Sequence, residues 1–269
     1  MSFGPIVGWV KEMTGSYNDI KLDREEGIAT LVLDKPPLNV LDIAMMEEMN
    51  DALKGLVGDS TLKALVFKAE GKAFSAGVDI SDHTEDKVED MIRIFHDIFR
   101  NMTRIHAPIV AAVKGAALGG GCEVAIFCDI VLASEKAKFG QPEIQVGVFP
   151  PIAAVTLPHL IGRGKALELV LTGDIIRADE AHRIGLVNQV YTIEEFDDKV
   201  EEYVAKLAHL SAPVLQLTKR SVTESMGRPF DDALSVVERI YLDELMETED
   251  AHEGLAAFLE KRGPEWKDR

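Results

Sequence analysis

The sequence predicts an α/β protein that ends in a helical region. From residue 27, short runs rich in β-branched residues alternate with longer segments of helical period, which predicts strands joined by helical crossovers. Strand signals stop near residue 193, and only helical periods follow. Hydrophobic residues make up 46% of the 269 residues and charged residues 28%, a balance that excludes a disordered or fibrous chain.

The individual elements follow from these periods. Strands are predicted at 28–33, 64–68, 109–113, 130–133 and 186–190. Amphipathic helices are predicted at 41–56, 88–102, 193–210, 212–226, 230–246 and 249–261. The chain therefore divides into an α/β core at 1–192 and a helical region at 193–269. The wide apolar face of 230–246 predicts that the helical region takes part in forming a homo-oligomer.

The net charge and the lack of long apolar runs predict where the protein is located and which partners it does not bind. Lys and Arg number 29 against 46 Asp and Glu, so the net charge of −17 repels nucleic acid and anionic membranes. The first fifteen residues hold no apolar run long enough for a signal peptide, and no run of 18 apolar residues occurs anywhere. These features predict a cytoplasmic protein with neither nucleic-acid nor membrane partners.

Motifs for several kinds of chemistry are missing. The sequence has no nucleophile elbow, no phosphate loop, no dinucleotide-binding glycine pattern and no metal-ligand spacing among its seven histidines, so neither a metal nor a nucleotide cofactor is predicted. The two cysteines, Cys122 and Cys128, lie six positions apart on a predicted helix, about 9 Å along its axis and on different faces. They are predicted to be free thiols.

Two segments place small residues directly after predicted strands. In KALVFKAEGKAFSAGVDI, at 63–80, such residues let another group approach the backbone, although an ordinary strand-exit loop has the same composition. In IVAAVKGAALGGGCEVAIFCD, at 109–129, three glycines open an apolar helix. The first N–H groups of a helix are unpaired and stabilise an oxyanion, but a glycine triplet is equally suited to tight helix packing.

Two glutamates accompany these segments. Glu123 falls in the first helical turn after the triplet, where acids are common, but its apolar neighbours leave no polar face to hold it in water. Burial would raise its pKa toward neutrality, where proton transfer is efficient. Glu143 lies in FGQPEIQVGVFPP, at 139–151, which is read as a loop, and taken alone it is typical of a solvated loop residue.

Together these segments resemble the enoyl-CoA hydratase/isomerase family, also called the crotonase family, from about residue 17 through FLEKRGPEW. The resemblance implies a ClpP/crotonase-like spiral of repeated ββα units and assembly into trimers or hexamers. It implies an oxyanion hole formed by the backbone N–H groups of Val78 and Gly120, and catalytic roles for Glu123 and Glu143. The substrate- or CoA-binding positions that it implies are Ala76, Gly77, Asp79, Ile80 and Gly119.

Retention of both glutamates favours a hydratase, an enzyme of the hydro-lyase class. One carboxylate deprotonates water, an acid protonates the substrate carbon, and the oxyanion hole holds the charge that develops on the thioester oxygen. Two carboxyl groups sharing one water titrate as a coupled pair. Such a site needs no cofactor, because coenzyme A is part of the substrate.

The departures from the common pattern concern the acyl group. Phe149, Pro150 and Pro151 stand where common fatty-acyl hydratases have a glycine-rich turn, which predicts a reshaped acyl pocket. With KPPLNVLD at 35–42, these residues resemble the branch that hydrates cyclohexa-1,5-diene-1-carbonyl-CoA to 6-hydroxycyclohex-1-ene-1-carbonyl-CoA in aromatic compound degradation. The alternatives are a short-chain enoyl-CoA hydratase of β-oxidation, an enoyl-CoA isomerase, and a non-catalytic RNA-binding relative, which the negative charge disfavours.

Overall fold

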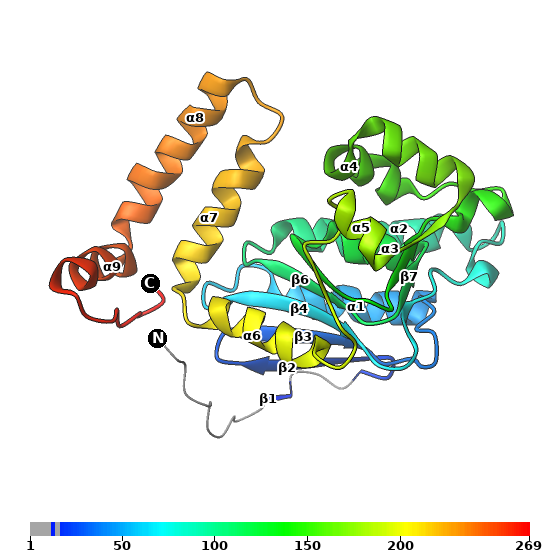
Figure 1. The fold of residues 1–269 in the computed structure, drawn as a ribbon, viewed down its shortest axis with the longest axis horizontal. Coiled ribbons are helices and arrows are strands. Elements are labelled where there is room, and N and C mark those ends of the chain that lie inside the picture. The colour runs from blue at the N-terminus through cyan, green and yellow to red at the C-terminus, as the bar shows by residue number, and fades with distance from the viewer. Residues whose placement is uncertain (1–11, 14–16) are drawn as a thin grey trace.

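The computed structural model describes residues 12–13 and 17–269. Figure 1 shows an α/β body from which a group of C-terminal helices extends. The prediction that the first residues carry no signal peptide concerns a segment that lies almost entirely outside the described residues. No helix within the described ranges has the length and hydropathy needed to span a lipid bilayer.

Two sheets form the body within the described residues. The larger sheet has the order β1 (Glu12–Met13), β2 (Ile20–Glu25), β3 (Ile28–Leu33), β4 (Ala64–Ala69), β6 (Ile109–Val113), β8 (Ile130–Ser134) and β11 (Gln189–Tyr191). The smaller sheet has the order β10 (Ile175–Arg177), β9 (Lys138–Gly140), β7 (Ala116–Leu118) and β5 (Ala73–Ser75). From β3 to β11 the strands of the larger sheet run parallel, as crossover connections require.

A ββα unit repeats three times along the chain. The units are β4, β5 and α2 (Val88–Arg104), then β6, β7 and α3 (Gly120–Phe127), then β8, β9 and α4 (Pro151–Thr172). In each unit the first strand joins the larger sheet, the second joins the smaller sheet, and the helix follows. This arrangement confirms the predicted spiral of ββα units, and it brings the ends of β5 and β7 to the start of α3.

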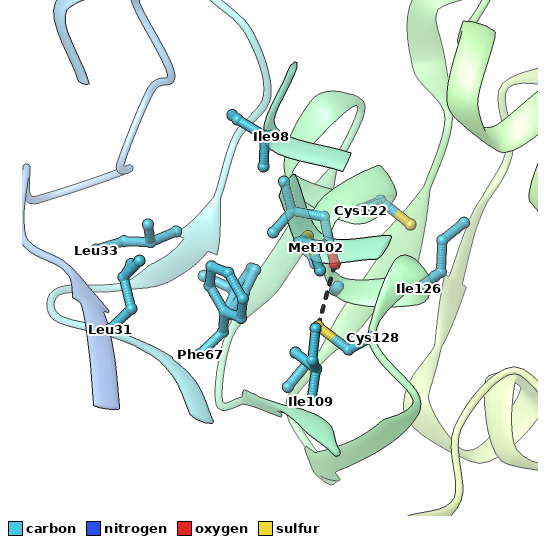
Figure 2. Close-up of a cluster of buried hydrophobic side chains, with 14 of the residues drawn as sticks. Leu31, Leu33, Phe67, Ile98, Met102, Ile109, Cys122, Ile126 and Cys128 are labelled. Carbon is cyan, nitrogen blue, oxygen red and sulfur yellow. Dashed lines mark hydrogen bonds between the residues drawn. The ribbon is translucent and has the colours of Figure 1, made fainter. Parts of the chain in front are cut away.

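The hydrophobic core lies between the larger sheet and the helices α1 (Ile43–Leu56) and α2. The apolar stripe of α1 is buried, which confirms the amphipathic helix predicted at 41–56. Figure 2 shows part of this core, in which Phe67 of β4, Met102 of α2 and Cys128 belong to one cluster of buried side chains. Cys122 and Cys128 are buried free thiols, as predicted, and Cys128 Sγ donates to the Val124 carbonyl at 3.3 Å.

The C-terminal region is helical, as predicted. It contains α6 (Phe196–Ala208), α7 (Ala212–Ser225), α8 (Phe230–Arg239) and α9 (Glu249–Glu260), whereas α5 (Ala178–Arg183) precedes it in the α/β core. Through Phe196 and Val200, α6 packs on the face of the larger sheet opposite α1, whereas α7 and α8 extend away from the body (Figure 1). The first helix of the C-terminal region is thus part of the core.

Several boundaries differ from the predicted ones. The strand predicted at 186–190 was wrong in its first half, because Leu186 and Val187 lie in the turn after α5, where both N–H groups donate to the Ala181 carbonyl. The helix predicted at 230–246 ends as an α-helix at Arg239 and continues as a π-turn and a 3-10 turn. The segment 139–151, read as a loop, contains a 3-10 helix, η2 (Pro142–Val146), and the start of α4.

The helix α4 and the strands of the smaller sheet escaped prediction. The helix carries Pro158 within it and a kink at Gly162, whose φ of 76° is not helical, so its apolar period is broken. The strands of the smaller sheet are three residues long, which is too short for an alternating pattern to be visible.

Candidate active site

A cavity of about 530 Å³ opens where the ends of β5 and β7 meet α2, α3 and η2. Of the predicted site residues, it is lined by Ala76, Gly77, Val78, Ile80, Gly119, Gly120, Glu123, Glu143, Phe149, Pro150 and Pro151. Asp79 does not line it. Its carboxylate accepts from the Ser81 N–H at 2.8 Å and caps a short 3-10 helix, η1 (Ile80–Asp82). Residues more than seventy positions apart in the sequence therefore share one site.

The backbone of Val78 presents its N–H toward this cavity. Leu41 pairs with Val78 as in a parallel strand, since the Leu41 N–H donates to the Gly77 carbonyl at 2.9 Å and the Leu41 carbonyl accepts from the Asp79 N–H at 3.0 Å. These two bonds occupy the residues on either side of Val78, so the N–H of Val78 itself points to the opposite side. It is free to donate to a ligand there.

The second donor of the predicted oxyanion hole lies on the facing segment. Gly120 is the first residue of α3, where N–H groups have no partner within the helix. Gly77 has a φ of 108°, and a Cβ atom built on it would lie 3.1 Å from the Leu118 carbonyl and 3.6 Å from the Gly120 nitrogen. Only glycine at position 77 permits this close approach of the two segments.

Each glycine of the triplet contacts a different part of the site. A Cβ on Gly119 would lie 2.8 Å from Glu143 Oε1, one on Gly120 would lie 2.7 Å from Val78 Cγ2, and one on Gly121 would lie 2.4 Å from Ser75 Cβ. The triplet therefore serves tight packing, and this packing is compatible with the predicted oxyanion hole. The absence of side chains lets the start of α3 approach both halves of the site.

Glu123 is buried, with a side chain only 2% exposed. Its Oε1 atom accepts from the Ala153 N–H at 2.8 Å, in the first turn of α4. Burial raises the pKa of Glu123 to about 8, and the nearby charge of Glu143 adds to the rise, while the hydrogen bond from Ala153 opposes it. A carboxyl group in this state exchanges protons near neutral pH.

Glu143 stands in the first turn of η2, and burial raises its pKa to about 7. The buried side-chain amide of Gln141 faces this carboxylate. With its nitrogen on that side, the amide lies 3.3 Å from each carboxylate oxygen and donates to both. The two glutamates thus come from different ββα units and face one cavity, each with a backbone or amide donor beside it.

The opposite wall of the cavity is apolar and was not predicted as part of the site. It is formed by Val88, Met91, Ile92 and Phe95 of α2, together with His83, whose Nδ1 lies 3.0 Å from the Asp79 carbonyl. In the sequence, the α2 residues belong to the apolar face of an amphipathic helix. The helical period does not distinguish the residues of that face that line the cavity from those that pack in the core. Phe149 is 68% exposed at the rim, whereas Pro150 is buried.

Lys114, which follows β6, lies away from the glutamates. Its Nζ forms an ion pair with Asp197 at 2.6 Å, which joins the end of β6 to α6. Among the residues the structure describes, no group of three His, Cys, Asp or Glu side chains is placed to hold a metal ion.

The geometry defines a class of protein. An α/β spiral presents two backbone N–H groups on facing segments, beside one buried and one half-buried carboxyl group, both with pKa values raised toward neutrality. Such a site stabilises an oxyanion while protons move to and from the adjacent carbon atoms.

Comparison with known proteins gives the family. A sequence model of the enoyl-CoA hydratase/isomerase family matches residues 23–269, and the chain belongs to this family. It is 37% identical over 254 residues to a cyclohexa-1,5-dienecarbonyl-CoA hydratase of Thauera aromatica, covering 92% of this chain and 96% of that one. It is 36% identical over 253 residues to a crotonyl-CoA hydratase of Syntrophomonas wolfei, covering 92% and 97%.

Solved structures agree with this assignment. A crystal structure of an enoyl-CoA hydratase from Mycobacterium smegmatis superposes with a TM-score of 0.88 at 32% identity, covering 93% of this chain and 99% of that one. An enoyl-CoA hydratase from Bacillus anthracis superposes with a TM-score of 0.89 at 29% identity, covering 94% and 100%. The predicted crotonase-like fold is therefore confirmed over nearly the whole chain.

Proposed function

We propose that this protein hydrates cyclohexa-1,5-diene-1-carbonyl-CoA to 6-hydroxycyclohex-1-ene-1-carbonyl-CoA. The broader activity is that of an enoyl-CoA hydratase, a hydro-lyase that uses an acyl-CoA thioester. The observation that carries the hydratase activity is the pair Glu123 and Glu143, both with raised pKa values, facing one cavity beside the oxyanion hole. Support for the ring substrate comes from the Phe149 to Pro151 turn and from the 37% identity to the Thauera aromatica enzyme.

The two carboxyl groups divide the work of adding water. The charged glutamate takes a proton from the water as its oxygen bonds to C2 of the ring, the β-carbon, and the electron pair of the C1=C2 bond moves onto the thioester oxygen. The N–H groups of Val78 and Gly120 stabilise that oxyanion. The other glutamate then donates its proton to the resulting dienolate.

The named product fixes where that proton goes. Return of the electrons from the oxyanion shifts the double bond to C1=C6, and the proton adds to C5, the far end of the second double bond. Renumbering the ring then places the hydroxyl group at C6. Protonation at C1, as for a simple enoyl thioester, would give a different isomer, so a ring substrate requires an acid that reaches across the ring.

A general short-chain hydratase is the competing function, and the identity of 36% to a crotonyl-CoA hydratase favours it about as strongly. Parallel assays of the cyclic dienoyl-CoA and crotonyl-CoA separate the two. Crotonyl-CoA hydration is followed by loss of the conjugated-thioester absorbance, and ring hydration by chromatographic separation of the product, which keeps a conjugated double bond. We expect kcat/KM for the ring thioester to exceed that for crotonyl-CoA at least tenfold, with the 6-hydroxy product identified by nuclear magnetic resonance.

A preference for crotonyl-CoA would replace the ring substrate with a short-chain one and leave the hydratase activity intact. Conversion of a 3-enoyl thioester without water addition would instead indicate an isomerase. A matched variant, Phe149→Gly, is expected to reduce the ring preference while activity on crotonyl-CoA changes little, because its exposed ring lies at the cavity rim.

Assembly, location and cofactor use belong to the same proposal. A homotrimer or hexamer is supported by the exposed apolar side chains of the C-terminal helices, including Phe230, Phe258 and Leu259. A monomeric mass by light scattering would contradict it. We expect chelators and prolonged dialysis to leave activity unchanged, since the carboxyl pair needs no cofactor, and cell fractionation to place the protein in the cytoplasm.

A further inference from the structure

We propose that Asn39 is a positioning residue of the oxyanion hole, and that its buried amide holds the segment that presents the Val78 N–H at the distance the thioester oxygen requires. This inference rests on the proposed function, because it assigns a role within the same site. Asn39 does not line the cavity, so its effect would pass through the backbone that it binds.

The side chain of Asn39 is bound on every side. It is 0% exposed, and its Nδ2 atom lies 2.7 Å from the Glu70 carbonyl, 2.9 Å from that of Ala73 and 3.2 Å from that of Phe74. Its Oδ1 atom accepts from the Lys35 N–H at 2.9 Å. One amide therefore fixes the turn after β4 and the strand β5, the chain that leads directly to Val78.

The backbone around Asn39 continues this attachment. The Pro37 carbonyl accepts from the Lys72 N–H at 3.1 Å, and the Leu38 carbonyl accepts from the Ala76 N–H at 2.9 Å. Beyond Asn39, Leu41 makes the two bonds that flank Val78. Residues 37–41 therefore run beside residues 72–79, and Asn39 lies in the middle of the contact.

The conformation of Asn39 indicates why an asparagine stands here. Its φ is 49°, in the left-handed region that asparagine adopts more readily than most residues other than glycine. In this conformation the side chain turns back toward the β4–β5 connection while Leu38 and Leu41 bond to residues 76–79 of the neighbouring segment. Asn39 thus combines a backbone shape and two amide donors that no other residue type supplies together.

A purely structural role is the alternative, and the chain offers a matched control for it. Asn50 is also buried, donates to the Met46 and Ile94 carbonyls at 3.0 and 2.8 Å, and accepts from Asn101 at 2.8 Å. It joins α1 to α2 and makes none of these bonds to residues 70–79. Loss of either amide should destabilise the fold, but only loss of Asn39 should displace the oxyanion hole.

The experiment compares Asn39→Gly, which keeps the left-handed backbone but removes the amide, with Asn50→Ala. Two readouts are measured: kcat and KM for the preferred thioester, and the red shift in absorbance of bound 4-dimethylaminocinnamoyl-CoA. The red shift reports polarisation of the thioester carbonyl, which a change in stability alone does not alter. Asn39→Asp, which keeps the acceptor for Lys35 but loses both donors, serves as a second variant.

We expect Asn39→Gly and Asn39→Asp to lower kcat roughly tenfold or more, a part of the loss that follows removal of an oxyanion donor, and to reduce the red shift. Asn50→Ala should lower the melting temperature while keeping kcat within about twofold and the full red shift. A full red shift in the Asn39 variants, an equal loss in Asn50→Ala, or failure of both Asn39 variants to fold where Asn50→Ala folds would overturn the proposal. Absence of any red shift in the wild type would instead contradict the proposed function.

Discussion

The Ala153 N–H donates a hydrogen bond of 2.8 Å to Oε1 of Glu123 and thereby joins the start of α4 to the start of α3. Pro151 opens α4, and the N–H groups of a first helical turn have no partner within the helix. Glu123 accepts the hydrogen bond from one of these N–H groups. The bond fixes the orientation of the carboxyl group and stabilises its charged form. The Pro150–Pro151 turn that departs from the common family pattern is thus also the turn that orients Glu123, which we propose to be catalytic.

Replacement of either glutamate by glutamine tests the carboxyl pair. Glu123→Gln and Glu143→Gln should each lower kcat by about 100-fold or more, because an amide can neither accept the proton from water nor supply one to carbon. Turnover is measured by chromatographic separation of the substrate and product thioesters, and circular dichroism checks the fold. Full activity in both variants would show that the reaction occurs elsewhere.

The raised pKa of Glu123 makes the stability of the protein depend on pH. The pKa of Glu123 is about 8 in the folded protein, whereas an ordinary glutamate has a pKa of 4.5. Between pH 4.5 and pH 8 the folded protein therefore holds a proton that the unfolded chain has released. The free energy of unfolding therefore falls as pH rises through this window, by at most about 1.4 kcal/mol per pH unit. Above the window Glu123 is ionised in both states, and its titration changes the free energy of unfolding no further.

Glu123→Gln removes this titration while its amide oxygen can still accept from Ala153. Urea unfolding at pH 5 and pH 8 should show the variant gaining stability relative to the wild type as pH rises. Glu253→Gln is the control, because Arg262 lowers the pKa of Glu253 to about 2 and the group does not titrate in this range. Equal pH dependence in wild type and Glu123→Gln would contradict the burial argument.

A methyl group at Gly119 should displace Glu143. The added Cβ would lie 2.8 Å from Glu143 Oε1, so Gly119→Ala is expected to lower kcat about tenfold or more by moving the carboxylate from its working position. Gly58→Ala also places alanine at a positive φ, 78°, but with no atom within 4 Å of the Cβ. This control should lose some stability and keep its activity, and similar activity losses in both variants would contradict the prediction.

Loss of the Gln141 amide should change the pH dependence of the reaction. The amide donates to the charged form of Glu143, so Gln141→Leu removes a partner of that form and raises the pKa of Glu143 further above its usual range. Glu123, Cys122 and His83 are the other titratable groups beside Glu143 or along the cavity, and this substitution leaves them in place.

We expect the acid limb of the kcat profile to move to higher pH in Gln141→Leu. Gln216→Leu is the control, since Gln216 donates to the Asp59 and Leu62 carbonyls on the far side of the sheet. It should lower the melting temperature without moving the profile. An unchanged profile in Gln141→Leu would show that the amide does not act on Glu143.

The sequence by itself determined the layered α/β core, the free thiols and the candidate carboxyl groups. Long amphipathic periods such as α1 and α2, and the fully buried run of β6, are visible in one dimension because burial of a face imposes a repeat. The segments around Gly119 and Glu143 were distinctive because their residue types serve close backbone approach. Whether these segments met could not be read from periodicity.

Only the tertiary structure decided which groups act together. It buried Glu123 against the start of α4, placed Gln141 beside Glu143, and turned part of the α2 stripe into a cavity wall. It also gave Asn39 three carbonyl partners more than thirty residues away. The physical reason is that pKa shifts, hydrogen bonds and oxyanion stabilisation depend on distances between segments that chain order leaves undefined.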